Sequence, residues 1–211
     1  MLSFQEEAGA ANELCAAASC RYATPAGMIY LRYGCPRSFV ARLSPDPGLR
    51  AFARRPEREH ELLLKIAEHR QGELALAYTA EGIIVGQLTV VPPDAWWEQM
   101  EICREVAIEV SENWRQLGIA GRLIELAAAR EELEDHILLG LGFSWHWDLE
   151  RTGFNRIEYR AMLARLVAPY GFSEYLTTEP NIRDDPSNIL LARLGIRVPQ
   201  AEVNRFYTCL L

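Results

Sequence analysis

Apolar positions recur along the chain with two spacings, one typical of strands and the other of helices. Alternating or unbroken apolar runs predict strands at 28–33, 73–78, 83–91, 102–110, 137–143, 172–177 and 203–209. Apolar residues three and four positions apart predict helices at 56–69, 119–134, 155–167 and 186–194. The resulting order, β–α–β–β–β–α–β–α–β–α–β, predicts a single mixed α/β domain with one core over 21–211. The Ala- and Glu-rich residues 1–20 are expected to form a separate segment, either disordered or a frayed helix.

The composition is that of a globular protein with a surplus of acidic residues. Of 211 residues, 49% are apolar and 24% are charged, which excludes wholesale disorder, a collagen-like repeat and a coiled-coil rod. The net charge of −7 argues against binding to nucleic acid or to anionic membranes, because both depend on surplus positive charge. All of the 22 basic residues except Lys65 are arginines. Lys65 and the N-terminal amine are therefore the only amines of this chain that an acylating reagent could modify.

Signals for export and for metal binding are missing from the sequence. No apolar run approaches the roughly 20 residues that span a bilayer, and the start of the chain lacks the basic and apolar regions of a secretory signal. Five cysteines without C-x-x-C spacing are typical of free thiols in a reducing compartment. The four histidines are scattered without ligand spacing. We therefore expect a cytoplasmic protein without a bound metal.

The passage with the clearest chemistry leads from the predicted strand 102–110 into the predicted helix that begins at 119. Gly118, Ala120 and Gly121 are small enough to let a ligand approach the backbone. The first turn of a helix presents unpaired N–H groups and the positive end of the helix dipole, and Arg115 adds a fixed charge. This pattern is typical of a pyrophosphate-binding turn, and a plain strand–loop–helix connection is the alternative. The dinucleotide fingerprint and the P-loop sequence are both missing.

The same passage resembles a known motif. Arg115-x-x-Gly118-x-Ala120 is similar to the Arg/Gln-x-x-Gly-x-Gly/Ala motif of the GNAT superfamily of acyl-CoA-dependent N-acyltransferases. The order of strands and helices around it is similar as well. The resemblance implies the GNAT fold, an α/β fold in which a mixed central sheet of about six to seven strands is flanked by helices. It also implies a splay between the motif strand and the strand that follows.

A second set of motifs resembles the acetoin-utilisation acetyltransferase branch of this superfamily. These motifs occur in order at 51–61, in the WHWDL run at 145–149, at 158–160 and at 188–195. Members of this branch are understood to acetylate a lysine of acetyl-CoA synthetase and so to inactivate it. The resemblance therefore implies an acetyl-CoA-dependent acetyltransferase that acts on a protein lysine, with acetyl-CoA synthetase as the expected partner.

The resemblance also implies which residues bind the donor. The CoA pyrophosphate is expected on backbone N–H groups that open the motif helix, and pantetheine is expected beside the end of the motif strand. The N–H of Ile108 is the candidate that polarises the acetyl carbonyl. The cofactor-binding candidates are Ile108, Val110, Arg115, Gln116, Gly118, Ile119, Ala120 and Gly121.

The sequence leaves the general base open. An acceptor ammonium must lose a proton, and the superfamily frequently has a glutamate for this purpose where this chain has Arg104. The adjacent Glu105 faces the opposite side of an ideal strand, so a bulge would be needed to bring it to the site. Glu101 and Glu109 are the alternatives. A solvated strand face, or pairing with one of the many arginines, would account for these carboxylates without catalysis.

Two further regions supply candidates for the acceptor side. Tyr159 is the candidate acid that protonates the leaving thiolate, and a half-buried core tyrosine is the alternative. In an extended WHWDL segment, Trp145 and Trp147 would share a face and bracket a lysine stem. Asp148 would attract the ammonium, and His146 would be a further base. Core packing by the indoles and helix capping by Asp148 are the alternatives.

Three functions are compatible with these residues. They are a protein-lysine acetyltransferase, a small-molecule amine acetyltransferase, and a non-catalytic module that senses acetyl-CoA. The third is favoured by the presence of Arg104 where the superfamily frequently has its catalytic glutamate. Basic residues that open the helix 56–69 fit an acidic protein surface, the CoA 3′-phosphate or a solvated face equally well; they are Arg54, Arg55 and Arg58.

Overall fold

The computed structural model describes residues 19–51, 55–93 and 95–211. Residues 1–18 lie outside this part of the chain, so the expected N-terminal segment stays a prediction, except that Ser19 and Cys20 begin the first strand. The chain forms two compact units. The first unit contains the described residues up to Thr89 together with Ile108–Ala129, and the second contains Val90–Ala107 and Arg130–Leu211. The single-domain organisation of 21–211 also stays a prediction.

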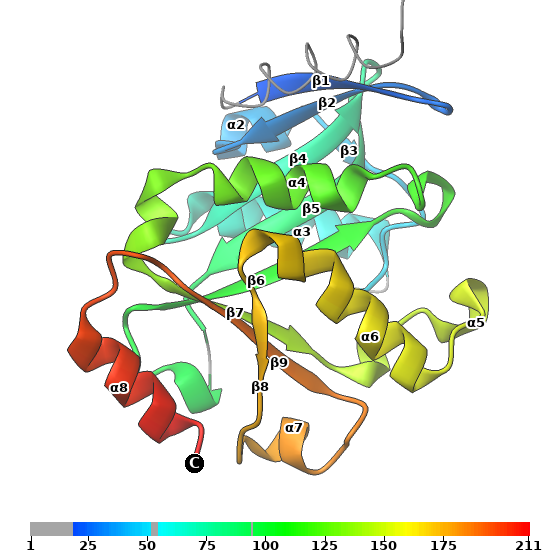
Figure 1. The fold of residues 1–211 in the computed structure, drawn as a ribbon. Coiled ribbons are helices and arrows are strands. Elements are labelled where there is room, and N and C mark those ends of the chain that lie inside the picture. The colour runs from blue at the N-terminus through cyan, green and yellow to red at the C-terminus, as the bar shows by residue number, and fades with distance from the viewer. Residues whose placement is uncertain (1–18, 52–54, 94) are drawn as a thin grey trace, which may run out of the picture. The chain divides into compact units, whose positions relative to one another are not determined.

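The strands follow one hydrogen-bonded order, β1–β2–β4–β5–β6–β7–β9–β8, with β3 paired to β5 (Figure 1). This order confirms the expected mixed α/β sheet flanked by helices. In the described residues the sheet has nine strands rather than six or seven, because the hydrophobic pattern does not predict β1, β3 or β9. The bounds are β1 Ser19–Thr24, β2 Gly27–Tyr33, β3 Ser44–Pro45, β4 Glu73–Thr79, β5 Ile83–Val91, β6 Cys103–Val110, β7 Ile137–Gly142, β8 Ser173–Tyr175 and β9 Ile189–Leu194.

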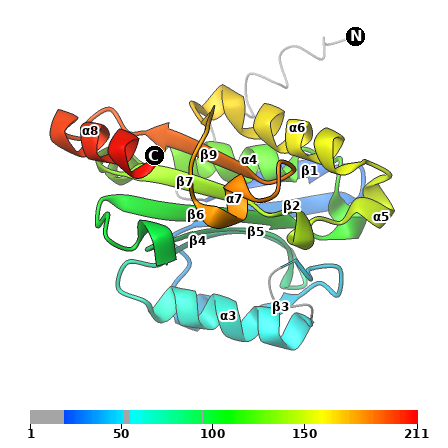
Figure 2. The same ribbon diagram turned by 90° about the horizontal axis from the view of Figure 1, so that it is seen from below.

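The first unit places its strands between two helices. β2 is antiparallel to both β1 and β4. Helix α3 (Pro56–Glu68) lies on one face of these strands and α4 (Ile119–Ala128) on the other, as Figure 2 shows. Side chains that α3 buries, such as Leu63, pack with Leu49, Leu76 and Ile84 in one apolar cluster. A short helix, α2 (Arg37–Val40), adds Val40 to this cluster.

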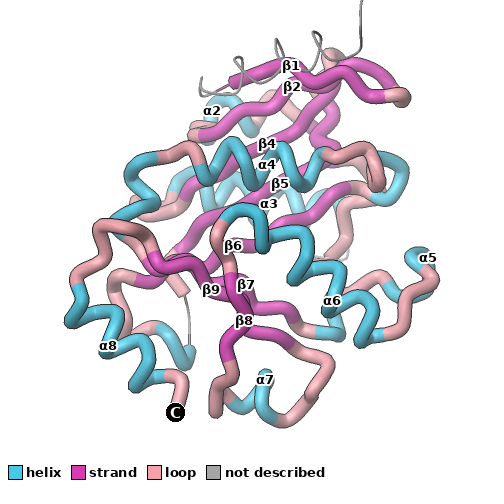
Figure 3. Tube along the Cα trace, viewed as in Figure 1, coloured by secondary structure: helices cyan, strands magenta, loops and turns pink. Residues whose placement is uncertain are grey.

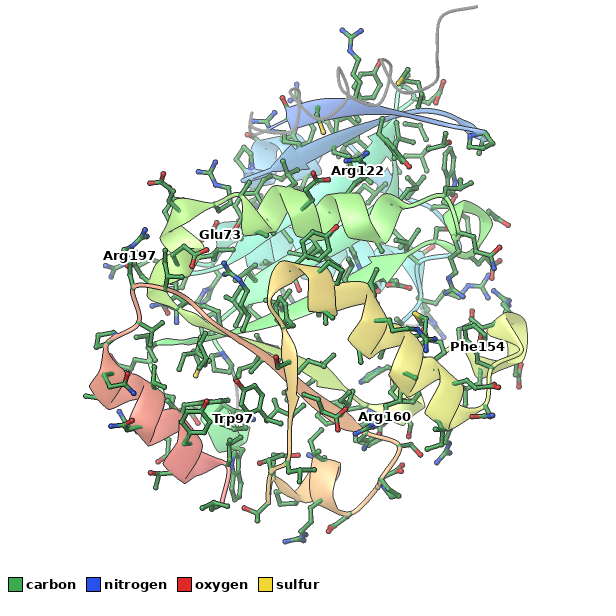
Figure 4. All side chains as sticks on the ribbon, viewed as in Figure 1. Glu73, Trp97, Arg122, Phe154, Arg160 and Arg197 are labelled. Atoms are coloured by element: carbon green, nitrogen blue, oxygen red, sulfur yellow. The ribbon has the colours of Figure 1, made fainter. Side chains whose placement is uncertain are left out.

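The second unit has its own core, on the sheet face that α8 (Gln200–Cys209) covers. Phe206 of α8 packs on Trp97 of η1 (Ala95–Trp97) with ring centroids 5.8 Å apart, and Trp97 is labelled in Figure 4. Both side chains are fully buried, with strand residues such as Ile137 and Leu190 beneath them. The remaining elements of this unit are η3 Glu131–Asp135, η4 Ser144–His146, α5 Leu149–Thr152, α6 Arg156–Val167, η5 Ala168–Tyr170 and α7 Pro180–Arg183.

Two predictions near the C-terminus are wrong, as Figure 3 makes clear. Residues 186–194 were expected to be helical but contain strand β9, which is buried because β7 and β8 pair on either side of it. A fully buried strand has no alternation, so its apolar run also satisfies helical spacing. Residues 203–209 were expected to form a strand but lie in α8, which buries Phe206, and the C-cap residue Leu210 is buried four residues further on.

The predicted helix 119–134 is too long. Helix α4 ends at Ala128, and after Ala129 and Arg130 the chain forms the separate 3-10 turn η3. Leu133 is buried from this turn, which accounts for the apolar spacing that continues past the true end of α4. The other predicted elements agree with the structure to within a few residues.

Candidate active site

The loop between β6 and α4 has the geometry of an anion-binding turn. After the 3-10 turn η2 (Glu112–Trp114), Gln116 has a φ of 61° and Gly118 a φ of 78°. Gly118 occupies the N-cap position of α4, and no side chain caps the helix there. The N–H groups of the first turn, such as those of Ile119 and Ala120, therefore point out of the helix toward a ligand position.

Tyr22 of β1 fixes this loop from the side. Its hydroxyl donates a hydrogen bond of 2.9 Å to the carbonyl of Leu117. A Cβ atom on Gly118 would lie 2.7 Å from the same hydroxyl oxygen, so the position requires glycine for its space as well as for its positive φ. The guanidinium of Arg122, labelled in Figure 4, lies 5.3 Å from the Tyr22 ring centroid. Arg122 also pairs with Glu125 at 2.7 Å, so its positive charge beside the first turn of α4 is balanced by a carboxylate.

Arg115 ties the loop back to the strand that precedes it. Its Nε donates a hydrogen bond of 3.1 Å to the carbonyl of Val110, the last residue of β6. The strand end and the start of α4 are thereby held together. This arrangement brings the expected cofactor-binding residues of the first unit into one region, and a fixed cation lies beside them.

Glu109 of β6 is a buried carboxylate next to this region. Its side chain is 6% exposed. One carboxylate oxygen, Oε1, accepts hydrogen bonds from the backbone N–H of Arg50 at 2.6 Å and of Ala51 at 2.8 Å. Strand alternation places Glu109 on the opposite face of β6 from Ile108 and Val110. The expectation of a solvated strand face is therefore wrong for Glu109.

Sequence reasoning missed two side chains that belong to the same cluster. The Nε2 atom of Gln87 (β5) lies 3.2 Å from Oε2 of Glu109 and 2.5 Å from Oε1 of Glu59 (α3). Glu59 and Gln87 are 0% and 1% exposed. One signal could have revealed them: Gln87 interrupts the apolar run IIVGQLTVV, and a polar residue inside a buried strand needs a buried partner. We call Glu59, Gln87 and Glu109 the buried carboxylate cluster.

The environment changes the acidity of Glu109. Burial raises the pKa of its carboxyl from an ordinary 4.5 to about 7, and the negative charge of Glu59 acts in the same direction. The two backbone N–H groups and the positive charge of Arg115 lower this pKa but do not offset the burial. A carboxyl with a pKa near 7 is a suitable proton acceptor at neutral pH.

The segment 46–51 keeps Glu109 in place. Asp46 Oδ1 accepts hydrogen bonds from the Ser111 hydroxyl at 2.5 Å and from the Gly48 N–H at 2.8 Å. A Cβ atom on Gly48 would lie 2.3 Å from the Ser111 oxygen, so the segment can pack this closely on the end of β6 only with glycine. The N–H groups of the next residues then reach Glu109.

The other carboxylates proposed from the sequence have different surroundings. Glu105 lies in the second unit, half-buried, at the point where β6 pairs with Leu139 of β7. The parallel register runs from Cys103–Ile137 to Glu105–Leu139, and β6 continues beyond it. Arg104 donates to the carbonyls of Glu101 and Cys103 at 2.6 and 2.7 Å, and Glu101 is exposed.

The WHWDL run is not an extended segment, so the expectation that its indoles share a face is wrong. Residues Ser144–His146 form a 3-10 turn, which rotates successive side chains by about a third of a turn. The exposed Trp145 stacks on Phe143 with ring centroids 4.6 Å apart. Trp147 stacks instead on Tyr159 at 5.0 Å, which brings two of the predicted residues into contact. Asp148 occupies the N-cap position of α5, and His146 is exposed.

Other motif residues meet in the second unit in a structural role. Arg160, labelled in Figure 4, donates from Nε to the carbonyl of Asn188 at 3.3 Å and pairs with Glu174 at 2.5 Å. The side-chain oxygen of Asn188 accepts from the N–H of Ser144 at 2.7 Å. These contacts link the residues around positions 160 and 188 to the start of the WHWDL region.

Comparison with known proteins shows close relatives. No protein-family model matches the chain. The chain is 33% identical over 163 residues to acetoin utilization protein AcuA of Bacillus subtilis, with 75% of this chain and 77% of that protein covered. It is 34% identical to the AcuA protein of Bacillus licheniformis over the same length and coverage.

The chain is also similar to solved structures of an acetoin utilization protein and of a GNAT domain. The acetoin utilization protein of Exiguobacterium sibiricum superimposes with a TM-score of 0.86 at 28% identity, and the match covers 92% of this chain and 94% of that one. The GNAT domain of S. lividans PAT has a TM-score of 0.52 at 13% identity, with 82% and 95% of the two chains covered.

The strand order, the turn at Gly118 and these structural matches define the class by its fold, which is the GNAT fold. The identity and coverage define the group within that class. The chain belongs to the acetoin utilization protein AcuA family.

Two further observations concern ligands and membranes. Within residues 19–51, 55–93 and 95–211, no three His, Cys, Asp or Glu side chains gather in a way that could hold a metal ion. In that same part of the chain, no helix is long and apolar enough to cross a membrane.

Proposed function

We propose that this protein transfers the acetyl group of acetyl-CoA to a lysine side chain of another protein, with acetyl-CoA synthetase as its substrate. The observation that carries the catalytic part is Glu109, a buried carboxyl whose pKa is raised to about 7 next to the expected thioester position at Ile108. The protein substrate rests on the resemblance to the acetoin-utilisation branch.

The donor binds in the first unit under this proposal. The CoA pyrophosphate lies on the first-turn N–H groups of α4 and the turn at Gln116 and Gly118, near Arg115. Pantetheine lies beside the end of β6, at Ile108 and Val110, and the N–H of Ile108 donates to the acetyl oxygen. The positive φ at Gly118 and the Tyr22 contact support this assignment, because they preform the turn before any ligand arrives.

Glu109 is the general base of the proposed reaction. It takes a proton from the acceptor ammonium, directly or through water, and leaves a neutral amine. The amine nitrogen attacks the acetyl carbonyl carbon, a C–N bond forms, and the C–S bond of the tetrahedral intermediate then breaks. The thiolate takes up a proton, for which Tyr159 is the proposed donor. Glu105 is the alternative base.

The acceptor side belongs to the WHWDL region in this proposal. Trp145 is 54% exposed and is held from behind by Phe143, so its indole can pack against a lysine stem. His146 and Asp148 lie beside it, and Asp148 supplies a negative charge for an ammonium. Trp147 has a different role from Trp145 in this proposal, because it stacks on Tyr159 and orients that ring.

Two features support an enzyme over a non-catalytic acetyl-CoA sensor. Arg104 occupies the usual position of the base, but Glu109 offers a carboxyl with suitable acidity on the same strand. A sensor would not need a buried carboxylate, whose desolvation costs free energy. We also propose that the protein works in the cytosol without a metal cofactor, and the free thiols of Cys35, Cys103 and Cys209 support a reducing compartment.

Radiolabelled acetyl-CoA tests the proposed function. The protein is incubated with acetyl-CoA synthetase, with unrelated lysine-rich proteins and with free polyamines, and label is counted in each acceptor. The proposal expects label on acetyl-CoA synthetase alone, at a lysine that mass spectrometry identifies. Turnover confined to polyamines would replace it with a small-molecule acetyltransferase. Tight acetyl-CoA binding without transfer to any acceptor would favour the sensor.

A further inference from the structure

The buried carboxylate cluster contains a second acidic residue that the proposed mechanism does not use. Glu59 comes from helix α3 and Glu109 from strand β6, so the two carboxylates reach the cluster from opposite directions in the first unit. Both are almost completely buried. Burying two carboxylates in one cluster costs free energy unless each of them accepts hydrogen bonds. The donors that both carboxylates share therefore need to be identified.

Gln87 connects them through a single nitrogen. Its amide nitrogen carries two hydrogens, and Nε2 lies within hydrogen-bonding distance of one oxygen on each glutamate. Each carboxylate therefore receives one N–H from the same group. The amide oxygen of Gln87 is buried and has no hydrogen-bond partner in the described part of the chain, so nothing there favours the reversed amide.

Among the described residues, three N–H groups donate to Glu109, and none of them belongs to Glu59. Oε1 accepts from the two backbone N–H groups, and Oε2 accepts from Gln87. A change at Glu59 can thus reach Glu109 by two routes: through the orientation of the Gln87 amide, and through the charge that Glu59 adds to the cluster.

We propose that Glu59 is a positioning residue for acetyl transfer, which holds Glu109 through the Gln87 amide and makes it a stronger base with its own negative charge. This inference rests on the proposed role of Glu109 as the general base. It adds a second carboxylate and its connecting amide to the machinery.

In the described part of the chain, the charged groups that act on Glu109 come from α3 and from the motif loop. They are Glu59 from α3, which raises its proton affinity, and Arg115 from the motif loop, which lowers it. The segment 46–51 contributes backbone N–H groups, because the Arg50 side chain turns away to the Pro47 carbonyl and to Glu112 at 3.8 Å. Strand β5 contributes the neutral Gln87 amide.

Two substitutions move the titration of Glu109 in opposite directions under this proposal. Glu59→Gln keeps the shape and an acceptor oxygen but removes the charge, so the midpoint falls by about one pH unit. Gln87→Met keeps the charge of Glu59 but removes a donor to the ionised Glu109, so the midpoint rises. Glu61→Gln is the matched control, since it makes the same charge change on the same helix at an exposed position.

Carbon-13 NMR of the glutamate side-chain carboxyls measures these midpoints in the folded protein without any acceptor. The Glu109 signal is assigned by its loss in Glu109→Gln, and acetyl-CoA binding confirms that each variant is folded. The expected result is a lower midpoint in Glu59→Gln, a higher one in Gln87→Met and no change in Glu61→Gln. Unmoved midpoints in folded Glu59→Gln and Gln87→Met would overturn the proposal.

The unsubstituted protein provides a test that does not depend on variant folding. In that protein the Glu109 signal should have its midpoint near 7, well above the ordinary 4.5. A midpoint at the ordinary value would overturn the proposal. The acidic limb of the pH–rate profile for acetyl transfer should shift as the NMR midpoints do. If no acceptor is acetylated, the proposed function fails while the NMR result still decides the coupling.

Discussion

The raised pKa of Glu109 has a consequence for folding stability that can be measured without knowledge of the substrate. An unfolded glutamate titrates near its ordinary value of 4.5, and the folded one near 7. The folded state therefore keeps the proton to a higher pH. The protein's free energy of unfolding therefore falls as the pH rises from about 4.5 to about 7, and above that range it no longer changes through this group.

The size of this effect follows from the two values. Each unit of pKa difference is worth about 1.4 kcal/mol, so the rise from 4.5 to about 7 corresponds to about 3 kcal/mol. In Glu109→Gln the amide at this position cannot titrate, so the variant does not show this pH-dependent loss of stability. The stability of the unsubstituted protein relative to Glu109→Gln should thus decrease by about 3 kcal/mol between about pH 4 and pH 8.

Urea denaturation of both proteins across this pH range is the assay. The difference between them cancels the titration of groups far from the cluster, and Glu61→Gln on the exposed face of α3 is the control. A difference between Glu109→Gln and the unsubstituted protein that does not change with pH would refute the reasoning. So would a difference of the opposite sign.

Further predictions concern the donor site, the second core and the single lysine. Gly118→Ala should weaken acetyl-CoA binding at least about tenfold in calorimetry, since φ is positive and Cβ meets Tyr22. Tyr22→Phe loses the bond to Leu117 and should weaken binding about fivefold. Phe206→Ala should destabilise the protein by about 3–5 kcal/mol in urea, since the ring is fully buried. Long incubation with acetyl-CoA should acetylate no internal amine except that of Lys65, as seen by mass spectrometry.

Much of the fold could be predicted from local pattern, and the failures have one physical cause. The strand at 137–143 and the helix at 56–69 were predictable because proline, glycine and apolar spacing agree there. Residues 186–194 and 203–209 were assigned the wrong element because periodicity alone cannot distinguish a short buried strand from a helical face. Tertiary contacts decide both: β9 lies between two strands, and α8 packs Phe206 on Trp97.

The candidate site, like the fold, could be predicted only in part from the sequence. The turn at Gly118 could be found from sequence, since small residues and a cation at fixed spacing follow a strand. The environment of Glu109 could not, because its partners Glu59 and Gln87 lie 50 and 22 residues away in the chain and meet it only after folding. Strand alternation correctly separates Glu109 from Ile108, but it does not say which face is buried.

Single-turnover transfer from preloaded acetyl-CoA most directly tests the central claim, that Glu109 is the general base. The unsubstituted protein, Glu109→Gln and Glu105→Gln are mixed with acetyl-CoA synthetase at pH 8, and acetyl-CoA affinity is measured for each. We predict that Glu109→Gln slows transfer by about 10²–10⁴-fold with unchanged acetyl-CoA affinity, while Glu105→Gln remains close to the unsubstituted rate. Transfer at the full rate by Glu109→Gln, with the loss in Glu105→Gln instead, would contradict the account.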